Sequence, residues 1–470
     1  MRVATDGFFI NDFLWMFLPI MFIGYYILPV KCRNVFLLLG SLIFYAWGEP
    51  RYILLMIFSI VINWILGIGI EKLTFKRKNI LFIADIVINI GILIYYKYFI
   101  FLANLLLRLI GLPALSYKIS LPIGISFFTF QIMSYIIDLY RGQYKAQKNI
   151  INIALYISFF PQLIAGPIVK YKDIEEQIQH RDISIEKIAS GIRRFIYGLA
   201  KKVILSNTIA CSVDIIFSMD NSDLTGILAW LGAILYTFQI YYDFSGYSDM
   251  AIGLGKMFGF DFQENFNYPY CSRNIQEFWQ RWHMSLGSWF REYLYIPLGG
   301  NRKGKAHTYF NLFIVFLATG LWHGANLTFL VWGIYHGIIC ILERMGLQKI
   351  LEKNRVITHV YTLLVIVFGW VVFRADSLFQ AKMFLYRMIF PWKYFNSTVD
   401  IKSILDYKIL VICCFAAIGC GIGQLSLVGV KLYKRIHNSY FEILYCALLF
   451  LICISMLASN TYNPFIYFRF

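Results

Sequence analysis

Long apolar runs recur along the whole chain, and they restrict what it can fold into. Many of them approach the ~20 residues that an α-helix needs to cross the hydrocarbon core of a bilayer. Residues 13–30, 53–70 and 79–107 are clear examples. A transmembrane β-barrel would instead show weak segments of roughly ten residues with alternating hydropathy. We therefore predict an all-α polytopic integral membrane protein.

The composition agrees with this fold class. Of the 470 residues, 59% are hydrophobic and 15% are charged, whereas soluble chains are about half apolar and about a quarter charged. The net charge of +17 could indicate nucleic acid binding. However, many Lys and Arg residues lie in short loops such as 72–78 and 141–148, where basic residues set membrane topology. We therefore expect a lipid bilayer, and no nucleic acid, as the environment of this chain.

The apolar runs predict about ten to twelve transmembrane helices in a single integral membrane domain spanning residues 1–470. The clear runs lie near residues 13–30, 34–47, 53–70, 79–107, 119–140, 226–242, 308–322, 325–342, 356–373, 407–429 and 440–459. We read 13–30 as a span because no basic segment or small-residue cleavage site marks a signal peptide. Pro161, Gly166 and Pro167 interrupt a further apolar segment. Residues 256–307 are too polar for ordinary spans, so we expect interfacial or re-entrant helices there.

Cysteine and histidine spacing gives no sign of a metal centre. The nine cysteines form no CxxC pair, and no two of the seven histidines have the spacing of an HExxH site. Most cysteines lie in apolar runs, where cysteine behaves as a small buried hydrophobe. We expect no bound metal.

Two carboxylates stand at the end of an apolar run, in QIYYDFSGYSDMAIGLGKMFGF at residues 239–260. Carboxylates inside a membrane are costly to bury and by default indicate a functional site. Asp243 and Asp249 are therefore candidates for lining the route to a site. The alternative is that they form a helix-capping turn just outside the bilayer.

Residues 265–304 combine aromatic, polar and basic side chains. As a continuous helix from Ser272, this segment would have two faces at 3.6-residue spacing. The aromatic face would hold Phe278, Trp282, Leu286 and Trp289. The polar face would hold Gln276, Gln280, His283 and Gly287. The alternatives are an interfacial helix anchored by Trp and Arg and a helix that presents His283 to a water-filled cavity.

The same segment holds four arginines, Arg273, Arg281, Arg291 and Arg302. Pro297, Gly299 and Gly300 then interrupt any helix beside a basic cluster. A basic cluster of this kind suits a phosphate or coenzyme group.

Histidine also appears in GLWHGANLTFLVWGIYHG, residues 320–337. Asn326 follows His323 by three residues, so on a continuous helix the two would share a face. A buried neutral imidazole at the end of an aqueous pocket can take a proton from an attacking hydroxyl. The alternative for His323 is hydrogen bonding to another helix for packing. We read His336 in that structural way, since it would lie about 220° further round the helix.

These segments together resemble the membrane-bound O-acyltransferase family, in its bacterial alginate O-acetyltransferase branch. The resemblance includes PQLIAGPIVKY at 161–171 and the terminal NPFIYFRF, and the block 241–337 is its most specific part. It implies a helical bundle of the family type, with its core at about 119–459. It also implies that His323, in Trp322-His323-Gly324, is the essential histidine, buried in a funnel through the membrane. His283 would support catalysis or acyl-donor binding.

The resemblance further implies an activity. The protein would move an acetyl group from a cytosolic donor, expected to be acetyl-coenzyme A, toward hydroxyls of an exported polysaccharide. It would lie in a bacterial plasma membrane, with no permanently bound cofactor and with His323 as general base. The residues expected to contact substrate or donor are Trp322, Asn326, Trp282, Gln280, Arg281, Arg291, Arg302, Asp243 and Asp249. A membrane-anchored, extracytoplasmic acetyltransferase would be the partner that completes the transfer.

Three alternatives remain open. One is transfer of a D-alanyl or other acyl group to a cell-wall polymer. Another is a non-enzymatic membrane component of polysaccharide export. The third is a transporter in which the histidines relay protons. Transporters often carry internal repeats with matched broken helices, and this chain has none that we can detect.

Overall fold

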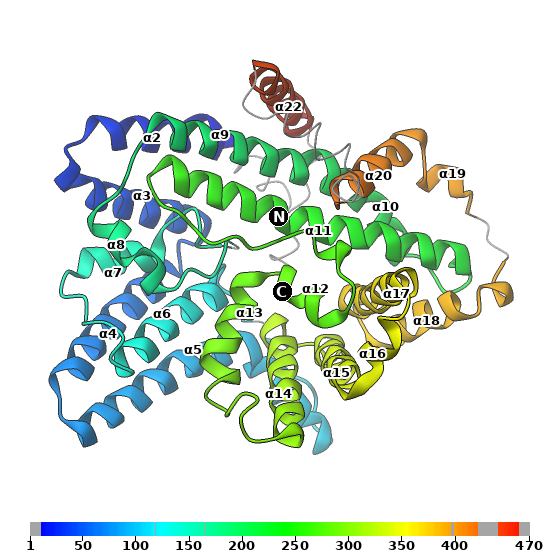
Figure 1. The fold of residues 1–470 in the computed structure, drawn as a ribbon, viewed down its shortest axis with the longest axis horizontal. Coiled ribbons are helices and arrows are strands. Elements are labelled where there is room, and N and C mark those ends of the chain that lie inside the picture. Colours follow the sequence, from blue (N-terminus) through cyan, green and yellow to red (C-terminus); the bar gives the residue numbers. More distant parts are fainter. Residues whose placement is uncertain (1–10, 118, 165, 396–398, 422–439, 460–470) are drawn as a thin grey trace. The chain divides into compact units, whose positions relative to one another are not determined.

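The computed structural model describes residues 11–117, 119–164, 166–395, 399–421 and 440–459, and helices dominate it (Figure 1). Backbone contacts divide the chain into two compact units. The N-terminal unit consists of residues 8–195 and 250–263. The C-terminal unit consists mainly of residues 196–249 and 264–470. The expectation of one integral domain stays a prediction.

Among the described residues, six helices are long and apolar enough to cross a membrane. They are Val30–Gly48, Ile53–Lys72, Lys76–Leu109, Leu327–Leu351, Arg355–Arg374 and Tyr440–Ala458. Three shorter apolar helices are Phe13–Ile27, Ile125–Tyr140 and Tyr407–Gly419. These helices confirm the predicted all-α polytopic membrane protein. Residues 422–429 of the predicted span 407–429 lie outside the described residues, as does the terminal segment 463–470.

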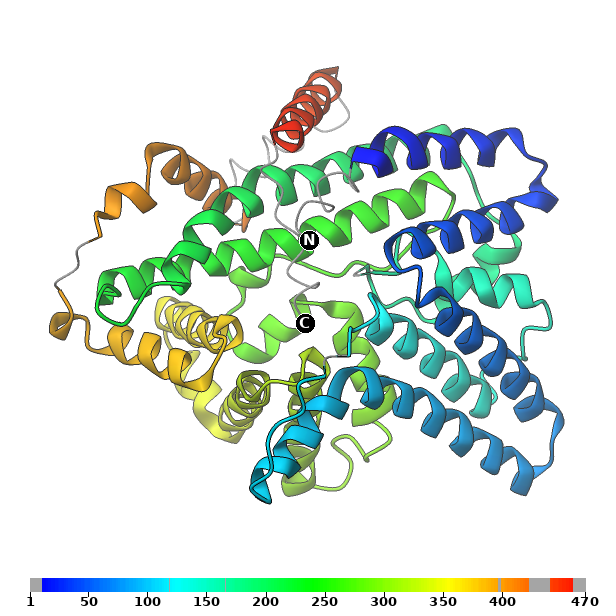
Figure 2. The ribbon, with the colours of Figure 1, turned by 180° about the vertical axis from the view of Figure 1, so that it is seen from behind.

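The N-terminal unit is a bundle built around one buried helix. Its elements are η1 (Phe13–Phe17), α2 (Leu18–Ile27), η2 (Val30–Cys32), α3 (Arg33–Gly48), α4 (Ile53–Lys72), α5 (Phe75–Leu109), α6 (Ile125–Tyr140), α7 (Ile150–Ser158), α8 (Tyr171–Gln179) and the first part of α9 (Ile185–Ala200). Figure 2 shows α4, α5 and α6 packed next to one another, in blue to cyan. Nearly every side chain of α6 is buried. Helix α7 ends before Pro161, as the proline predicts.

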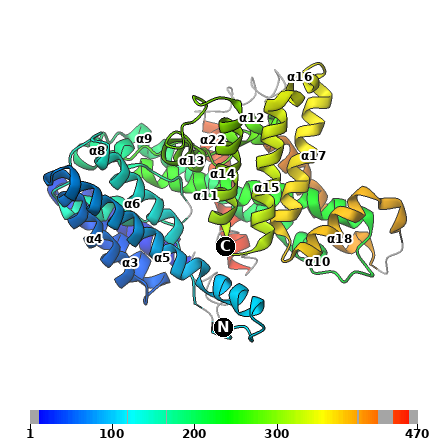
Figure 3. The same ribbon diagram turned by 90° about the horizontal axis from the view of Figure 1, so that it is seen from below.

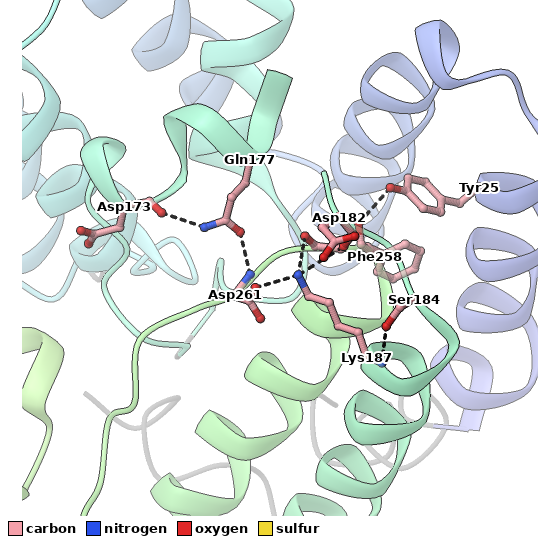
Figure 4. A network of polar contacts seen from close by, with 9 residues as sticks. Tyr25, Asp173, Gln177, Asp182, Ser184, Lys187, Phe258 and Asp261 are labelled. Atoms are coloured by element: carbon pink, nitrogen blue, oxygen red, sulfur yellow. Dashed lines mark hydrogen bonds and ion pairs between the residues drawn. The ribbon is translucent and has the colours of Figure 1, made fainter. Parts of the chain in front are cut away.

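A polar network joins α8, the start of α9 and residues 258–261 within this unit (Figure 4). Lys187 Nζ lies 2.7 Å from Asp261 Oδ2 and also donates to the carbonyls of Asp182 and Gly259. The Asp261 backbone N–H donates to Gln177 Oε1 at 2.7 Å. The network gives the backbone groups of a connecting segment internal hydrogen-bond partners.

The C-terminal unit holds the remaining elements. They are η3 (Lys201–Ser206), α10 (Asn207–Phe217), most of α11 (Gly226–Met257), η4 (Pro269–Cys271), α12 (Ile275–Arg281), α13 (Met284–Phe290), η5 (Arg291–Tyr295), α14 (Lys305–His323), α15 (Leu327–Leu342), η6 (Glu343–Leu347), α16 (Gln348–Leu351), α17 (Arg355–Arg374), α18 (Leu378–Ile389), η7 (Pro391–Lys393), α19 (Ile401–Ile404), α20 (Tyr407–Gly419) and α22 (Tyr440–Ala458). Several of these helices begin behind a side-chain cap, a position where Asn, Asp and Ser satisfy orphan backbone N–H groups. The capping residues include Asn274, Asn326, Asn354, Ser377 and Asp406.

Glycines let α14 and α15 pack as a close hairpin (Figure 3). A Cβ on Gly320 would lie 2.4 Å from the Phe329 carbonyl oxygen, and a Cβ on Gly333 would lie 2.5 Å from that of Phe316. Both obstacles are backbone atoms, so any side chain at either position would push the helices apart. Small residues of this kind allow close helix contact in membranes. The hairpin fixes the C-terminal end of α14, where His323 stands.

A second close crossing involves α11. In the C-terminal unit, a Cβ on Gly246 would lie 2.8 Å from the Gly198 carbonyl oxygen. In the N-terminal unit, a Cβ on Gly253 would lie 2.6 Å from the Gly191 carbonyl oxygen. Gly246 lies between Asp243 and Asp249 in the sequence. Because α11 passes close to the end of α9 at Gly246, η3, which follows α9, lies beside these two carboxylates.

Candidate active site

His323 is the last residue of α14 and sits among aromatic rings. Only 7% of the surface of His323 is exposed to solvent. The ring centroid lies 4.9 Å from Phe373 and 5.2 Å from Trp332, and both rings are nearly perpendicular to the imidazole. Trp322 stands 5.0 Å away. An imidazole enclosed in this way is shielded from bulk water.

His283 lies in a break between two short helices. Helix α12 ends at Arg281, α13 begins at Met284, and His283 has a left-handed backbone with φ of 45°. The continuous helix predicted from Ser272 is therefore wrong. The reason is a long-range backbone pairing, because the Met284 N–H donates to the Asn265 carbonyl and the Asn267 N–H donates to the Arg281 carbonyl. These contacts replace the helical hydrogen bonds that a continuous helix would need.

The imidazole of His283 is 3% exposed and held by polar and aromatic contacts. Its Nδ1 lies 3.1 Å from Asn265 Oδ1. The ring of Phe244 on α11 packs edge-on at 4.6 Å between centroids. Four residues later on α11, Ser248 Oγ accepts from Asn265 Nδ2 at 2.8 Å. One face of α11 therefore supports His283 both directly and through Asn265.

The two histidines meet at one tryptophan. The Trp322 ring centroid lies 5.9 Å from His283 and 5.0 Å from His323. The structure thus brings together residues 283, 322 and 323, which lie in two separate segments of the sequence and are all predicted site residues. Trp322 is 5% exposed, so the ring that contacts both imidazoles is buried.

Glu343 fixes the start of α12. Its carboxylate accepts from the Ile275 N–H at 3.0 Å and from the Gln276 N–H at 3.3 Å. Charge-assisted bonds to the N-terminal N–H groups of a helix are stronger than neutral ones. Because α12 leads directly into the break at His283, this buried carboxylate anchors the start of the helix that precedes the break.

We expect Glu343→Ala to lower stability by about 1–3 kcal/mol, because the buried Ile275 N–H and the part-buried bond from the Gln276 N–H both lose their acceptor. Thermal unfolding of the purified protein in detergent measures this loss. Glu343→Gln keeps an acceptor oxygen and should melt closer to wild type. Glu352→Ala is the matched control, since Glu352 is exposed and its carboxylate accepts a bond from the side chain of Gln348, on the helix surface. A Glu343→Ala protein that melts like wild type would contradict this assignment.

Asp243 and Asp249 lie inside α11 and pair with consecutive lysines. Asp243 pairs with Lys202, and both side chains are 2% exposed. Asp249 Oδ2 lies 2.5 Å from Lys201 Nζ, in a more exposed pair. The alternative of a helix-capping turn is therefore wrong, because α11 continues to Met257. Their expected place along a substrate route stays a prediction.

Asn326 does not share a helix face with His323. Helix α14 ends at His323, and Asn326 caps the next helix by accepting from the Thr328 N–H at 3.2 Å. Its Nδ2 donates to the Asp376 carbonyl at 3.2 Å. The chain is extended at Gly324, directly after His323, in agreement with the interruption between the predicted spans 308–322 and 325–342. His336 likewise stands on a different helix from His323, and both pack against Trp332.

The other predicted contact residues are divided between core and surface. Trp282 is buried, with its ring 4.8 Å from Trp370 and 5.6 Å from Phe278. Gln280 is exposed, so it does not share a polar face with His283. Arg281 pairs with Glu277 at 2.7 Å. Arg291 and Arg302 are exposed. The structure places these arginines on η5, on the loop that follows it and at the end of α12, and their role as phosphate contacts stays a prediction.

Sequence reasoning missed the residues that support the site. Asn265, Ser285 and Phe244 surround His283, while Lys201 and Lys202 pair with the α11 carboxylates. A local signal for Asn265 is the segment NFNYPY at residues 265–270, in which asparagines alternate with aromatic residues. Among the described residues, no three His, Cys, Asp or Glu side chains come together as a metal site.

Comparison with known proteins adds to this geometry. Residues 141–379 match the membrane-bound O-acyltransferase family. The chain is 45% identical to the probable alginate O-acetylase of Pseudomonas aeruginosa over 81% of this chain and 74% of that protein. It is 39% identical to the protein of the same name from Pseudomonas putida over 98% of this chain and 99% of that protein. It is 36% identical to a peptidoglycan O-acetyltransferase of Helicobacter pylori over 80% of this chain and 78% of that protein.

Proposed function

Because this chain belongs to the membrane-bound O-acyltransferase family, we propose that it transfers acetyl groups toward hydroxyls of an exported polysaccharide. It is a multi-pass membrane O-acyltransferase, and we place it in a bacterial plasma membrane. The observation that carries the proposal is the buried His323 at the end of α14, enclosed by aromatic rings and joined to His283 by Trp322.

The names of the relatives support the acyl group and the acceptor class. Two are named as probable alginate O-acetylases and one as a peptidoglycan O-acetyltransferase. Alginate and peptidoglycan both present sugar hydroxyls. We therefore propose a polysaccharide hydroxyl as the final acceptor and acetyl-coenzyme A as the donor, with no cofactor held between turnovers.

The chemistry assigned to His323 is general base catalysis. Its imidazole takes the proton of the attacking hydroxyl as the hydroxyl oxygen bonds to the acetyl carbonyl carbon. The carbon–sulfur bond then breaks, and the proton passes to the departing coenzyme A sulfur. The surrounding rings exclude water that would otherwise hydrolyse the thioester. Arg281, Arg291 and Arg302 supply cations suited to the coenzyme phosphates.

We also propose a partner. Because His323 is only 7% exposed, a serine side chain, which is slimmer than a sugar ring, would reach its imidazole more easily. A membrane-anchored, extracytoplasmic acetyltransferase with an acceptor serine would collect the acetyl group and complete the transfer to the polymer.

Cells that carry the intact export locus test the function. Deleting this chain should remove ester-linked acetyl from the secreted polymer while the polymer is still exported, and the wild-type chain should restore it. Mild alkaline release and chromatography identify the acid that was esterified. Released alanine in place of acetate would favour D-alanyl transfer, and loss of the polymer itself would favour a role in export.

A further inference from the structure

Asn265 determines how His283 presents its imidazole. We infer that Asn265 is a positioning residue that holds His283 as the neutral tautomer protonated at Nδ1. His283 Nε2 then accepts a hydrogen bond from a substrate and cannot donate one. The catalytic meaning of this inference rests on the proposed acyl transfer, but the tautomer itself does not.

The orientation of the Asn265 amide follows from its neighbours. The Ser285 backbone N–H can only donate, and it lies 3.2 Å from the Asn265 side-chain atom assigned as Oδ1. That atom must therefore be the oxygen. The Asn265 amide nitrogen then faces Ser248 Oγ at 2.8 Å, which can accept. Asn265 is 1% exposed, so it is enclosed by these partners.

The proton position on His283 follows in turn. Asn265 Oδ1 has no hydrogen to give, and His283 Nδ1 lies 3.1 Å from it. A hydrogen bond at this distance requires that Nδ1 carry the proton. Burial lowers the pKa of His283 to about 3, so the ring holds one proton at neutral pH. Nε2, on the opposite edge of the ring, is left with its lone pair.

The backbone reinforces this arrangement. A left-handed conformation at a residue other than glycine costs roughly 1–3 kcal/mol and persists only where surrounding contacts impose it. Here the Asn265 carbonyl accepts from the Met284 N–H at 2.9 Å, directly after His283. Asn265 therefore holds His283 twice, through its main chain and through its side chain.

This tautomer restricts what His283 can do in the reaction. Stabilising a developing oxyanion requires a hydrogen-bond donor, and Nε2 without a proton is not one. His283 instead accepts from an O–H of the acceptor or from an amide N–H of the coenzyme arm, and so orients that group. The oxyanion must find its donors elsewhere.

Three variants test the role in catalysis. Asn265→Ala removes the oxygen that fixes Nδ1–H, and we expect kcat to fall about 10-fold, the scale of losing one orienting hydrogen bond. Asn265→Asp keeps an oxygen acceptor in either protonation state and should retain much more activity. Asn267→Ala is the matched control, because Asn267 is exposed and its backbone bond to Arg281 is retained. Equal kcat in Asn265→Ala and wild type, at matched membrane abundance, would overturn the inference.

A spectroscopic measurement tests the tautomer without turnover. Nitrogen-15 NMR of histidine-labelled protein in nanodiscs separates protonated from unprotonated ring nitrogens, and His283→Gln identifies the signal of interest. Wild type should show Nδ1 protonated and Nε2 unprotonated, and Asn265→Ala should show a mixture of tautomers. A wild-type signal with Nε2 protonated would refute the inference. The expected tautomer in a protein that forms no acetyl ester would instead refute the proposed function alone.

Discussion

Replacing His323 by alanine is expected to abolish O-acylation of the secreted polymer while export continues. The variant removes the base that the proposed mechanism uses, a contribution of about 10²–10⁴-fold for general acid–base catalysis. His323 ends α14 against Gly324, so the change does not interrupt the helix interior. The measurement is ester-linked acetyl per unit of polymer, compared at matched membrane abundance of the two proteins.

His336→Gln provides a matched control for this result. His336 is also a buried histidine, and its ring packs against the same Trp332 at 5.0 Å. It contacts Trp279 at 4.9 Å and is assigned to packing. Most acylation should survive this substitution, whereas His323→Gln should behave like His323→Ala. Unchanged ester content in His323→Ala would eliminate the general-base mechanism.

Removing Lys202 is expected to destabilise the protein by about 3–5 kcal/mol, the usual cost of removing one partner of a buried ion pair. Lys202→Met takes away the cation with which Asp243 pairs, at a place where both side chains are 2% exposed. Gly246 brings the backbone of η3 against α11 next to this pair, so little water can replace the lysine. Thermal unfolding of the purified protein in detergent, and its abundance in membranes, measure the loss.

Two further variants make this prediction specific. Lys201→Met breaks the neighbouring pair with Asp249, whose side chains are 30% and 17% exposed. It should cost far less, because more exposed pairs contribute only about 0–1 kcal/mol. The double variant Lys202→Met with Asp243→Leu removes both buried charges and should recover much of the lost stability. If Lys202→Met and Lys201→Met were equally mild, the buried pair would not be the stabilising element we describe.

Hydropathy and local chemistry were sufficient to find the principal candidate residues. His323 and His283 were identified because an imidazole in an apolar or aromatic segment is costly to bury and therefore indicates a functional role. The structure places both within contact of Trp322. Helical periodicity was less reliable near the site. It predicted one helix through His283 and one face shared by His323 and Asn326, and both expectations are wrong.

The sequence by itself determined that this is an all-α membrane protein, because hydropathy over ~20 residues depends only on neighbours in the chain. It also marked the histidines in apolar or aromatic segments as candidate site residues. Only the tertiary structure decided that the helix breaks at His283, that Asn265 holds its ring, and that Asp243 pairs with Lys202. Asn265 lies 18 residues from His283, and Lys202 lies 41 residues from Asp243. Such partners are selected by the way helices pack, and glycines such as Gly246 and Gly320 control how closely they can approach.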